Sequence, residues 1–512
     1  MKIASKIIKD LIKTRAITPD DLASFKRKIA KRYNIPCLSN IELLKVYHEL
    51  TTNKRIKKSE KIENLLITRP VRSLSGIVNI SVLTKPYPCP GKCLYCPAES
   101  GIPKSYVSGE PAVERAKKLK FDPYLQVKKR IEMLEAEGHP ADKIELRIVG
   151  GTWSYYPKSY QNWFVKKCFD ACNEKQGENL KEAQKLNEKA KYRIIGLSVE
   201  TRPDFVNTLE IKQLRNLGTT MVELGVQSVY DDVLKLNLRG HGIKETILAT
   251  KLLKDTGFKV LYQMMPDLPG SSLKKDEKMF EELFKNPDFQ PDLLKIYPCA
   301  LLKEAPLYKL YKEGKYRPYT ETQLTKLIEK IKKGIPYYVR IQRISRDIPS
   351  KTIVAGPAKV SNLRQFLLEK MKKEGWQCKC IRCREVKEKY LPKEKLYLFR
   401  ENYKASGGKE IFLSFENKNG TKLCSLLRLR LSSQNKALIR EIHTYGQLVP
   451  LSQKQTAIQH QGLGKKLIKE AEKIAKKEFG LKKIAVIAGI GARDYFRKLG
   501  YKLKDTYMVK SI

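Results

Sequence analysis

Three cysteines in one short segment have the spacing of ligands to an iron–sulfur cluster. They lie in the segment PYPCPGKCLYCPAES, where Cys89, Cys93 and Cys96 form a C-x3-C-x2-C pattern. Three thiolates this close together can bind three irons of a [4Fe–4S] cluster, which leaves the fourth iron open to a substrate. A structural zinc site is the alternative, but such a site normally has four protein ligands, and no further Cys or His lies nearby in the sequence. The spacing therefore favours a cluster that takes part in chemistry.

A second cysteine group follows much later in the chain. Cys378, Cys380 and Cys383 fall within six residues, and in a reducing compartment metal binding is favoured over disulfides. Three thiolates suit a structural zinc between two domains, with Cys299 or a histidine as candidates for a fourth ligand and reduced, unliganded thiols as the alternative. The remaining cysteines are expected to be small core residues; they are Cys37, Cys168, Cys172, Cys299 and Cys424.

A glycine turn near the C-terminus could bind a diphosphate. It lies in IQHQGLGKKLIKEAEKIAKK, where Gln459, Gly462, Leu463, Gly464 and Lys465 precede or begin a helix with one apolar stripe. Glycines let a phosphate approach the backbone, and the free N–H groups of a helix N-terminus attract an anion. A turn of this kind is weak evidence alone, so the fold around it has to support the prediction.

The elements that would position the first cysteine group alternate between strand and helix. From about residue 75 to 345, apolar runs such as GIVNISVLT, KIELRIVGG and YRIIGLSVE alternate with helical patterns. At least six such runs predict a parallel sheet in a full or partial (β/α) barrel, with the ligand site at the C-terminal ends of the strands. Candidate ligand-binding residues follow or close these strands: Gly150, Gly151 and Thr152, then Glu200, then Gln227.

The rest of the chain divides into three further parts. Residues 1–60 carry 15 Lys or Arg against six Asp or Glu and show helical spacing of apolar residues, which predicts a basic helical module that contacts RNA. The barrel is expected over residues 61–370, and residues 371–394 form a cysteine-containing linker. Residues 395–512 have the pattern of antiparallel strands, a glycine turn, a long helix and a final strand, which predicts a second α/β domain.

The charge of the chain points to a polyanionic partner. Lys and Arg total 102 against 55 Asp and Glu, a formal net charge of +47. Neutralising phosphates releases counterions and drives binding, so nucleic acid is the expected partner; a Lys-rich surface adapted to heat or salt is the alternative. No run of 18 apolar residues and no signal-peptide pattern occurs, so we expect a cytoplasmic protein without a membrane partner.

The first cysteine motif and the strand-end residues together resemble the radical S-adenosylmethionine (SAM) superfamily. In that superfamily the open iron of the cluster binds the amino and carboxylate groups of SAM, and an electron from the cluster cleaves SAM to a 5′-deoxyadenosyl radical. The resemblance implies that Gly150, Gly151 and Thr152 lie near the SAM amino group. It implies further cofactor contacts from Glu200 and Gln227, and an electron donor as a partner.

The C-terminal part resembles the GCN5-related acetyltransferases, whose pyrophosphate loop has the pattern Q/R-x-x-G-x-G/A. The resemblance implies that residues 459–465 bind acetyl-CoA and that a preceding strand runs beside its pantetheine arm, formed here by Glu441, Ile442, His443 and Thr444. A packed strand histidine is the alternative for His443. In the family a tyrosine near the thioester can protonate the leaving thiolate, which implies Tyr495 as a general acid. Some relatives have two adjacent tyrosines here; this chain has Phe496, expected in the acetyl-CoA wall.

The pairing of the two domains resembles the catalytic subunits of Elongator, in their single-subunit archaeal form. The similarity is carried by long stretches in the same order, including GLSVETRPD, ELGVQSVYDDVLKLNLRGH, QRISRDIPS, IREIHTYGQLVP and DYFRKLGY. It implies an enzyme that makes 5-carboxymethyluridine at the tRNA wobble position from acetyl-CoA and SAM, acting on the anticodon stem-loop. It also implies that Lys143 lies near acetyl-CoA, although by sequence alone Lys143 reads as an ordinary surface lysine. A homodimer and accessory Elongator subunits are partners that the sequence leaves open.

Two other functions compete with this one. A protein lysine acetyltransferase would use the second domain and treat the barrel as a scaffold, without need of SAM or RNA. An RNA-binding module with degenerate catalytic sites would keep the charge and lose the ligands. The intact cysteine motif and glycine turn argue against the latter, and a Cys93→Ala variant separates the former from an RNA-modifying enzyme.

Overall fold

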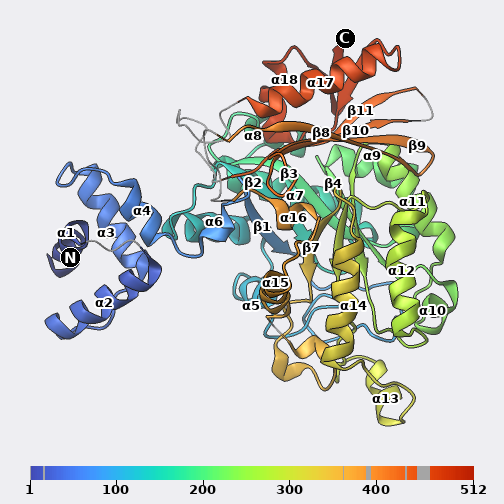
Figure 1. Cartoon of the computed structure of the whole chain (residues 1–512), viewed down its shortest axis with the longest axis horizontal. Coiled ribbons are helices and arrows are strands. Elements are labelled where there is room, and N and C mark those ends of the chain that lie inside the picture. Colours follow the sequence, from blue (N-terminus) through green and yellow to red (C-terminus); the bar gives the residue numbers. More distant parts are fainter. Residues whose placement is uncertain (1, 15–17, 361, 388–393, 433–434, 447–461) are drawn as a thin grey trace.

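A computed structural model of the chain describes residues 2–14, 18–360, 362–387, 394–432, 435–446 and 462–512. It has a helical N-terminal region, a seven-stranded parallel sheet and a second seven-stranded sheet at the C-terminus. Figure 1 shows the N-terminal helices, in blue, to one side of the parallel sheet, and the C-terminal domain, orange to red, across one end of it. The predicted fold class is confirmed.

Four helices form the N-terminal region: α1 (Lys2–Lys13), α2 (Pro19–Tyr33), α3 (Asn40–Thr52) and α4 (Glu60–Leu66). Reciprocal capping by Thr18 with Asp21 and by Ser39 with Glu42 starts α2 and α3, because each pair satisfies N–H groups that the first turn leaves free. The four helices share one apolar core, so the region is a small body with its own interior. It meets the rest of the chain where Leu44 lies against Gly138, just after α6.

The first sheet is parallel throughout and runs in chain order from β1 to β7. Its strands are β1 (Val78–Leu83), β2 (Lys143–Val149), β3 (Arg193–Thr201), β4 (Met221–Gln227), β5 (Lys259–Met264), β6 (Leu293–Ile296) and β7 (Arg340–Ile344). In-order parallel pairing with a helix in most connections is the half-barrel that the alternating pattern predicts. Because helices cover its outer face, β4 is buried at every residue.

The helices of this part follow the strands in the order expected of repeated βα units. They are α5 (Pro111–Lys118), α6 (Pro123–Ala136), α7 (Lys158–Asn173), α8 (Leu180–Asn187), α9 (Thr208–Asn216), α10 (Asp231–Leu236), α11 (Ile243–Asp255), α12 (Leu273–Lys285), α13 (Leu307–Lys312), α14 (Glu321–Gly334), α15 (Leu363–Lys373) and α16 (Ile381–Arg384). Asn or Asp caps several of them, as at Asn207 before α9 and Asp122 before α6.

The second sheet has the order β13-β14-β12-β11-β10-β9-β8. Its elements are β8 (Tyr397–Ala405), β9 (Gly408–Glu416), β10 (Leu423–Leu431), β11 (Ala437–Thr444), α17 (Leu463–Lys477), β12 (Lys483–Val486), α18 (Arg493–Arg497), β13 (Lys502–Lys504) and β14 (Tyr507–Ser511). Only β11 and β12 pair in parallel, and a register shift interrupts the β10–β11 ladder after Arg428. The shift bends the sheet where α17 crosses it.

The two sheets meet across a buried network of charges. The C-terminal domain packs against the N-terminal ends of the parallel strands: Arg440 of β11 donates to the carboxylate of Asp292, just before β6, and Arg430 of β10 donates to Asp255 at the end of α11. Asp292 also accepts from the backbone N–H of Val260 at 2.8 Å. Burial opposes ionisation of Asp292, but the positive charges of Arg440, Lys254 and Arg428 lower its pKa overall, so the carboxylate stays charged.

Two smaller findings bear on the predictions. Four of the five cysteines expected in cores are buried, whereas Cys37, in the loop between α2 and α3, is exposed, so the prediction for Cys37 is wrong; it follows an Asn-Ile-Pro turn and not an apolar face. Over the described ranges, no helix has the length and apolarity needed to cross a membrane.

Candidate active site

The loop after β1 carries Cys89, Cys93 and Cys96 at the C-terminal end of the sheet. Cys93 is buried and the other two are half-buried. A buried arginine connects the loop to β4. Arg239 donates from Nη1 to Cys93 Sγ at 3.5 Å and from Nη2 to the carbonyl of Gly225 at 2.6 Å. A cation that donates to a cysteine sulfur stabilises the thiolate form, which is the form that ligates iron.

The neighbouring strand ends provide a close-fitting backbone cradle. Gly150 and Gly151 follow β2 with φ of 120° and 53°, and a Cβ at Gly150 would lie 2.3 Å from Thr84 Oγ1. Only glycine fits this turn, which lets a ligand approach the backbone. Thr152 continues the turn, with Oγ1 at 3.6 Å from Cys89 Sγ. The three residues predicted near SAM therefore lie beside the cysteine loop.

Gln227 ends β4 in a strained position that faces the same space. Its φ is 71°, which a residue with a side chain rarely adopts, and its buried Oε1 has no hydrogen-bond partner among the described residues. A buried polar atom without a partner is costly in a folded protein unless a ligand satisfies it. Gln227 thus fits the predicted cofactor contact.

Glu200, near the end of β3, is held as a carboxylate by three neighbours from other elements. It accepts hydrogen bonds from Tyr106 Oη at 3.2 Å and Gln263 Nε2 at 3.0 Å, and its Oε1 lies 3.2 Å from Lys295 Nζ. Burial opposes ionisation, but Lys295 outweighs it and lowers the pKa of Glu200. Its side chain is therefore charged and fixed before any ligand binds.

Some of these residues line one cavity of about 670 Å³. Cys96, Glu200 and Gln227 lie in its wall together with Lys295 and Tyr297. Cavities of 300–1,000 Å³ hold a small-molecule ligand or a nucleoside. Cys96 of the cysteine loop, Glu200 and Gln227 therefore share one space large enough for a small-molecule ligand.

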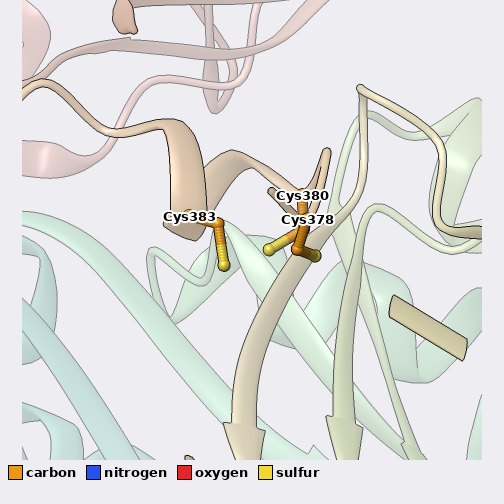
Figure 2. Close-up of side chains that lie close together, drawn as sticks. All are labelled: Cys378, Cys380 and Cys383. Carbon is orange, nitrogen blue, oxygen red and sulfur yellow. The ribbon is translucent and has the colours of Figure 1, made fainter. Parts of the chain in front are cut away.

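The second cysteine group is gathered as a metal site would be. The Sγ atoms of Cys378, Cys380 and Cys383 all lie within 4.8 Å of one another, and Figure 2 shows them converging between α16 and the turn before it. Within the described ranges no other His, Cys, Asp or Glu completes this group. Cys299 packs instead with Val233 and Leu268 in another apolar cluster, so the suggestion that it supplies a fourth ligand is wrong. The sequence alone does not show which apolar cluster a single cysteine will join.

At the start of α17, Gly464 lies close to three other residues predicted to bind acetyl-CoA. Gly462 caps the helix with φ 72°, and a Cβ at Gly464 would lie 3.0 Å from Tyr495 Oη, 3.5 Å from Ile442 Cδ1 and 3.9 Å from Thr444 Oγ1. Burial raises the pKa of Tyr495 to about 12, so its hydroxyl keeps its proton at neutral pH. Leu463 is buried and Lys465 is exposed in the first turn, and Gln459 lies outside the described residues.

Three other predicted residues have side chains in packing or ionic contacts. Glu441 accepts from Arg428 Nε at 2.7 Å and lies 3.2 Å from Lys259 Nζ, and these charges, against the effect of burial, lower its pKa to about 2. His443 Nε2 lies 2.7 Å from the carbonyl of Ser75, before β1, and burial lowers its pKa. Phe496 is 2% exposed and packs into the domain core behind Tyr495.

Lys143 lies at the opposite end of the parallel sheet from the cysteine loop. It is the first residue of β2, at the strand ends on which the C-terminal domain packs, and burial lowers its pKa. A seven-residue strand is about 23 Å long. The residues predicted for the two cofactors thus lie at the two ends of the half-barrel.

Sequence reasoning missed the residues that support the site from other strands. Arg239, Tyr106, Gln263 and Lys295 were not among the predicted residues, although each contacts one that was. A charged residue inside a buried run, such as Lys295 in LLKIYP, is the available signal. This signal cannot identify the partner of the charged residue, because the partner lies on a strand that is far away in the sequence.

Comparison with known families divides the chain in the same way. The Radical SAM superfamily matches residues 87–283, the Radical_SAM C-terminal domain matches residues 291–373, and the Acetyltransferase (GNAT) family matches residues 455–501. The first range begins after β1 and includes β2 to β5, the second includes β6 and β7, and the third includes α17, β12 and α18.

Similar proteins match the chain over nearly its whole length. The tRNA uridine(34) acetyltransferase of Methanocaldococcus infernus is 44% identical over all of this chain and 98% of its own length. Human Elongator complex protein 3 is 38% identical over 99% of this chain and 96% of its own. Among solved structures, the archaeal Methanocaldococcus infernus Elp3 with an N-terminal deletion has a TM-score of 0.76 and 45% identity, covering 86% of this chain and all of that one.

Proposed function

Because the chain belongs to the family of the tRNA uridine(34) acetyltransferases and Elongator complex protein 3, we propose that it modifies uridine 34 of tRNA by radical chemistry. The observation that carries the proposal is one cavity lined by Cys96 of the cysteine loop, by Glu200 and by Gln227, whose buried Oε1 has no hydrogen-bond partner among the described residues. The same chain has an acetyltransferase-type fold with its glycine turn and Tyr495 in contact range. The two sites together fit an enzyme that joins an acetyl-derived group to a base.

The product we propose is 5-carboxymethyluridine, made from acetyl-CoA and SAM. Cys89, Cys93 and Cys96 would hold a [4Fe–4S] cluster, and SAM bound to it supplies a deoxyadenosyl radical when reduced. The residues around it fit this group: Arg239 neutralises thiolate charge, Gly150 gives backbone access, and Gln227 offers a free acceptor. The protein's part is to bind, to orient the reacting groups and to exclude water.

The C-terminal domain would bind acetyl-CoA and release the product as an acid. Gly462, Gly464 and the N–H groups of α17 would hold its diphosphate with Gln459, and the β11 backbone would run beside the pantetheine arm. Tyr495, protonated at neutral pH, would give its proton to the leaving thiolate during thioester hydrolysis. Lys143 would meet acetyl-CoA from the barrel end.

We expect Tyr495→Phe to slow acetyl-CoA hydrolysis about 10²-fold or more, because general-acid catalysis contributes about 10²–10⁴-fold. Acetyl-CoA affinity should change little, since the ring remains. Free thiol release in the presence of tRNA measures the rate. The control is Tyr397→Phe, on the edge strand β8 of the same sheet. Hydrolysis at the wild-type rate in Tyr495→Phe would remove the acid role from this residue.

The experiment that tests the proposed function is nucleoside mass spectrometry of tRNA after an anaerobic reaction. The reaction contains cluster-reconstituted protein, dithionite, SAM, acetyl-CoA and unmodified tRNA. The expected result is a carboxymethyluridine that requires both SAM and acetyl-CoA. Cleavage of SAM without any modified uridine would contradict the proposal. Acetylation of a lysine-containing peptide without SAM would favour a protein acetyltransferase instead.

We also propose that Cys378, Cys380 and Cys383 hold a zinc ion that joins the two sheets. The segment links both: Ile381 N–H donates to Val339 O before β7, and Val386 N–H donates to Leu423 O of β10. Lys332 Nζ lies 3.6 Å from Cys383 Sγ and would offset the negative charge of three thiolates around zinc.

We expect Cys380→Ser to lose the metal and to lower the thermal midpoint by about 5–10 °C, since metal binding stabilises the fold that forms the site. Elemental analysis and differential scanning fluorimetry measure the two effects. The matched control is Cys424→Ser, which removes another buried thiol outside the group. Equal metal content in Cys380→Ser and the wild type would rule out these thiols as the ligands.

The proposed activity brings further requirements. An electron donor must reduce the cluster, and the anticodon stem-loop must reach the cavity mouth. We expect the enzyme to work in the cytoplasm. Size-exclusion chromatography with light scattering tests for a homodimer, and co-purification tests for accessory Elongator subunits.

A further inference from the structure

Four arginines from three segments line the cavity. Arg69 precedes the 3-10 turn η1 (Pro70–Arg72), Arg72 ends it, Arg115 lies in α5 and Arg130 in α6. The same cavity wall contains Cys96, Glu200 and Gln227. We refer to these four residues as the arginine cluster. Neither the sequence motifs nor the proposed cofactor sites account for it.

The positive charge of the arginine cluster is only partly compensated. Arg72 pairs with Glu137, whereas the other three arginines make no ion pair within 4.0 Å in the part of the chain that the structure describes. Arg130 directs a guanidinium nitrogen to Met133 Sδ at 3.0 Å, a weak acceptor. Arg72 and Arg130 are half-buried, whereas Arg69 and Arg115 are exposed. A group of cations with so few paired carboxylates repels itself and attracts anions.

Crowding within the arginine cluster lowers the pKa of two of its members. Burial, and then the charges of Arg72, Arg115 and Arg69, lower the pKa of Arg130 to about 10. Burial and the charges of Arg69 and Arg115 also lower the pKa of Arg72. Arg130 still remains cationic at neutral pH. Bringing them together therefore costs the free protein stability that a bound anion would restore.

The backbone at Arg69 adds a second observation. Its φ is 55°, in the left-handed region, and Pro70 follows it directly. A residue with a Cβ rarely adopts this conformation. Strain of this kind is typical of segments whose conformation serves a bound ligand. Arg69 lines the cavity together with Arg72.

We propose that the arginine cluster binds the phosphodiester groups on either side of a nucleotide whose base occupies the cavity. This inference rests on the proposed function and adds a binding site for the RNA backbone. A base that reacts must leave its stack, and its flanking phosphates then stay at the rim, where they need cations. Guanidinium groups match phosphate oxygens in pairs, which explains four arginines where lysines are abundant elsewhere.

Equilibrium binding of a labelled anticodon stem-loop to the full chain tests the proposal. We expect Arg115→Gln and Arg130→Gln each to weaken binding about threefold to tenfold at moderate salt. Each should also lower the slope of log affinity against log salt by about one, as the loss of one phosphate contact does. The matched control is Arg400→Gln, an arginine of β8 that pairs with Glu478 far from the cavity; it should bind as the wild type does.

Two further readouts separate a phosphate site from a structural role. The thermal midpoint of the free variants should stay constant or rise, because a repelling charge has been removed; a structural arginine would lower it. RNA with uncharged methylphosphonate linkages beside uridine 34 should bind the wild type and Arg130→Gln equally.

Wild-type binding and salt slope in both variants would overturn the assignment while leaving the proposed function intact. Failure of the wild type itself to bind the stem-loop would instead contradict the proposed function. Loss of affinity for an acidic peptide, with RNA binding unchanged, would assign the cluster to a protein ligand and overturn the proposal.

Discussion

Replacing Cys93 with alanine is expected to abolish SAM cleavage and uridine modification while leaving acetyl-CoA binding intact. Cys93 is the most buried of the three loop cysteines and accepts a hydrogen bond from Arg239. Loss of residues that only support a metal ligand costs about 10–100-fold, so loss of a ligand should cost more than about 100-fold. Iron and sulfide content, the spectrum of the reduced cluster and the yield of 5′-deoxyadenosine measure the effect.

The matched control for Cys93→Ala is Cys37→Ala. Cys37 is exposed in the N-terminal region, so its loss should change neither iron content nor activity. Acetyl-CoA binding by calorimetry tests whether the C-terminal domain of Cys93→Ala remains folded. Uridine modification by Cys93→Ala at the wild-type rate would exclude cluster chemistry at this loop and return the question to an acetyltransferase.

Asp292→Asn is expected to destabilise the contact between the two sheets by about 3–5 kcal/mol, the usual cost of breaking a buried ion pair from one side. The fully buried carboxylate of Asp292 accepts from both Nη atoms of Arg440 and lies 3.6 Å from Arg428 and 3.7 Å from Lys254. Asparagine keeps the shape but not the charge, so three buried cations lose their shared partner. The midpoint of urea unfolding, followed by tryptophan fluorescence and by limited proteolysis, measures the loss.

The control for this substitution is Asp288→Asn, four residues earlier. Asp288 is exposed, and changes at such surface positions usually stay within about 0.5 kcal/mol. The comparison removes effects of the Asp-to-Asn chemistry as such. Equal unfolding midpoints for Asp292→Asn and Asp288→Asn would mean that the charge network contributes nothing to holding the sheets together.

The fold could be predicted from the sequence, and candidate ligands could be proposed from it, because both depend on local patterns. Alternating apolar runs and helical patterns predict the parallel half-barrel, since burial on both faces demands apolar strands such as β4. The spacing of Cys89, Cys93 and Cys96 is local, as is the turn at Gly462. Gly150 was predicted at a strand end, and the structure shows why a side chain cannot stand there.

The supporting contacts depended on which elements become neighbours in space. Arg239 and Cys93 are 146 residues apart, and Arg440 and Asp292 are 148 residues apart. Their pairing follows from strand order and from the docking of one sheet on the other. The local periodicity of apolar residues carries no information about such neighbours. The same holds for His443 and for Glu441, whose side chains serve the contact between domains.

The sequence by itself determined the chemistry that each segment could perform, because ligand types and backbone freedom are properties of short stretches. Only the tertiary structure decided that the cysteine loop and Lys143 lie at opposite ends of one half-barrel, and that four arginines meet at the cavity mouth. Charges scattered over 62 positions, from Arg69 to Arg130, read as solvated surface in a chain of net charge +47. Packing brings them together, and their mutual repulsion is the basis for proposing an anion-binding site.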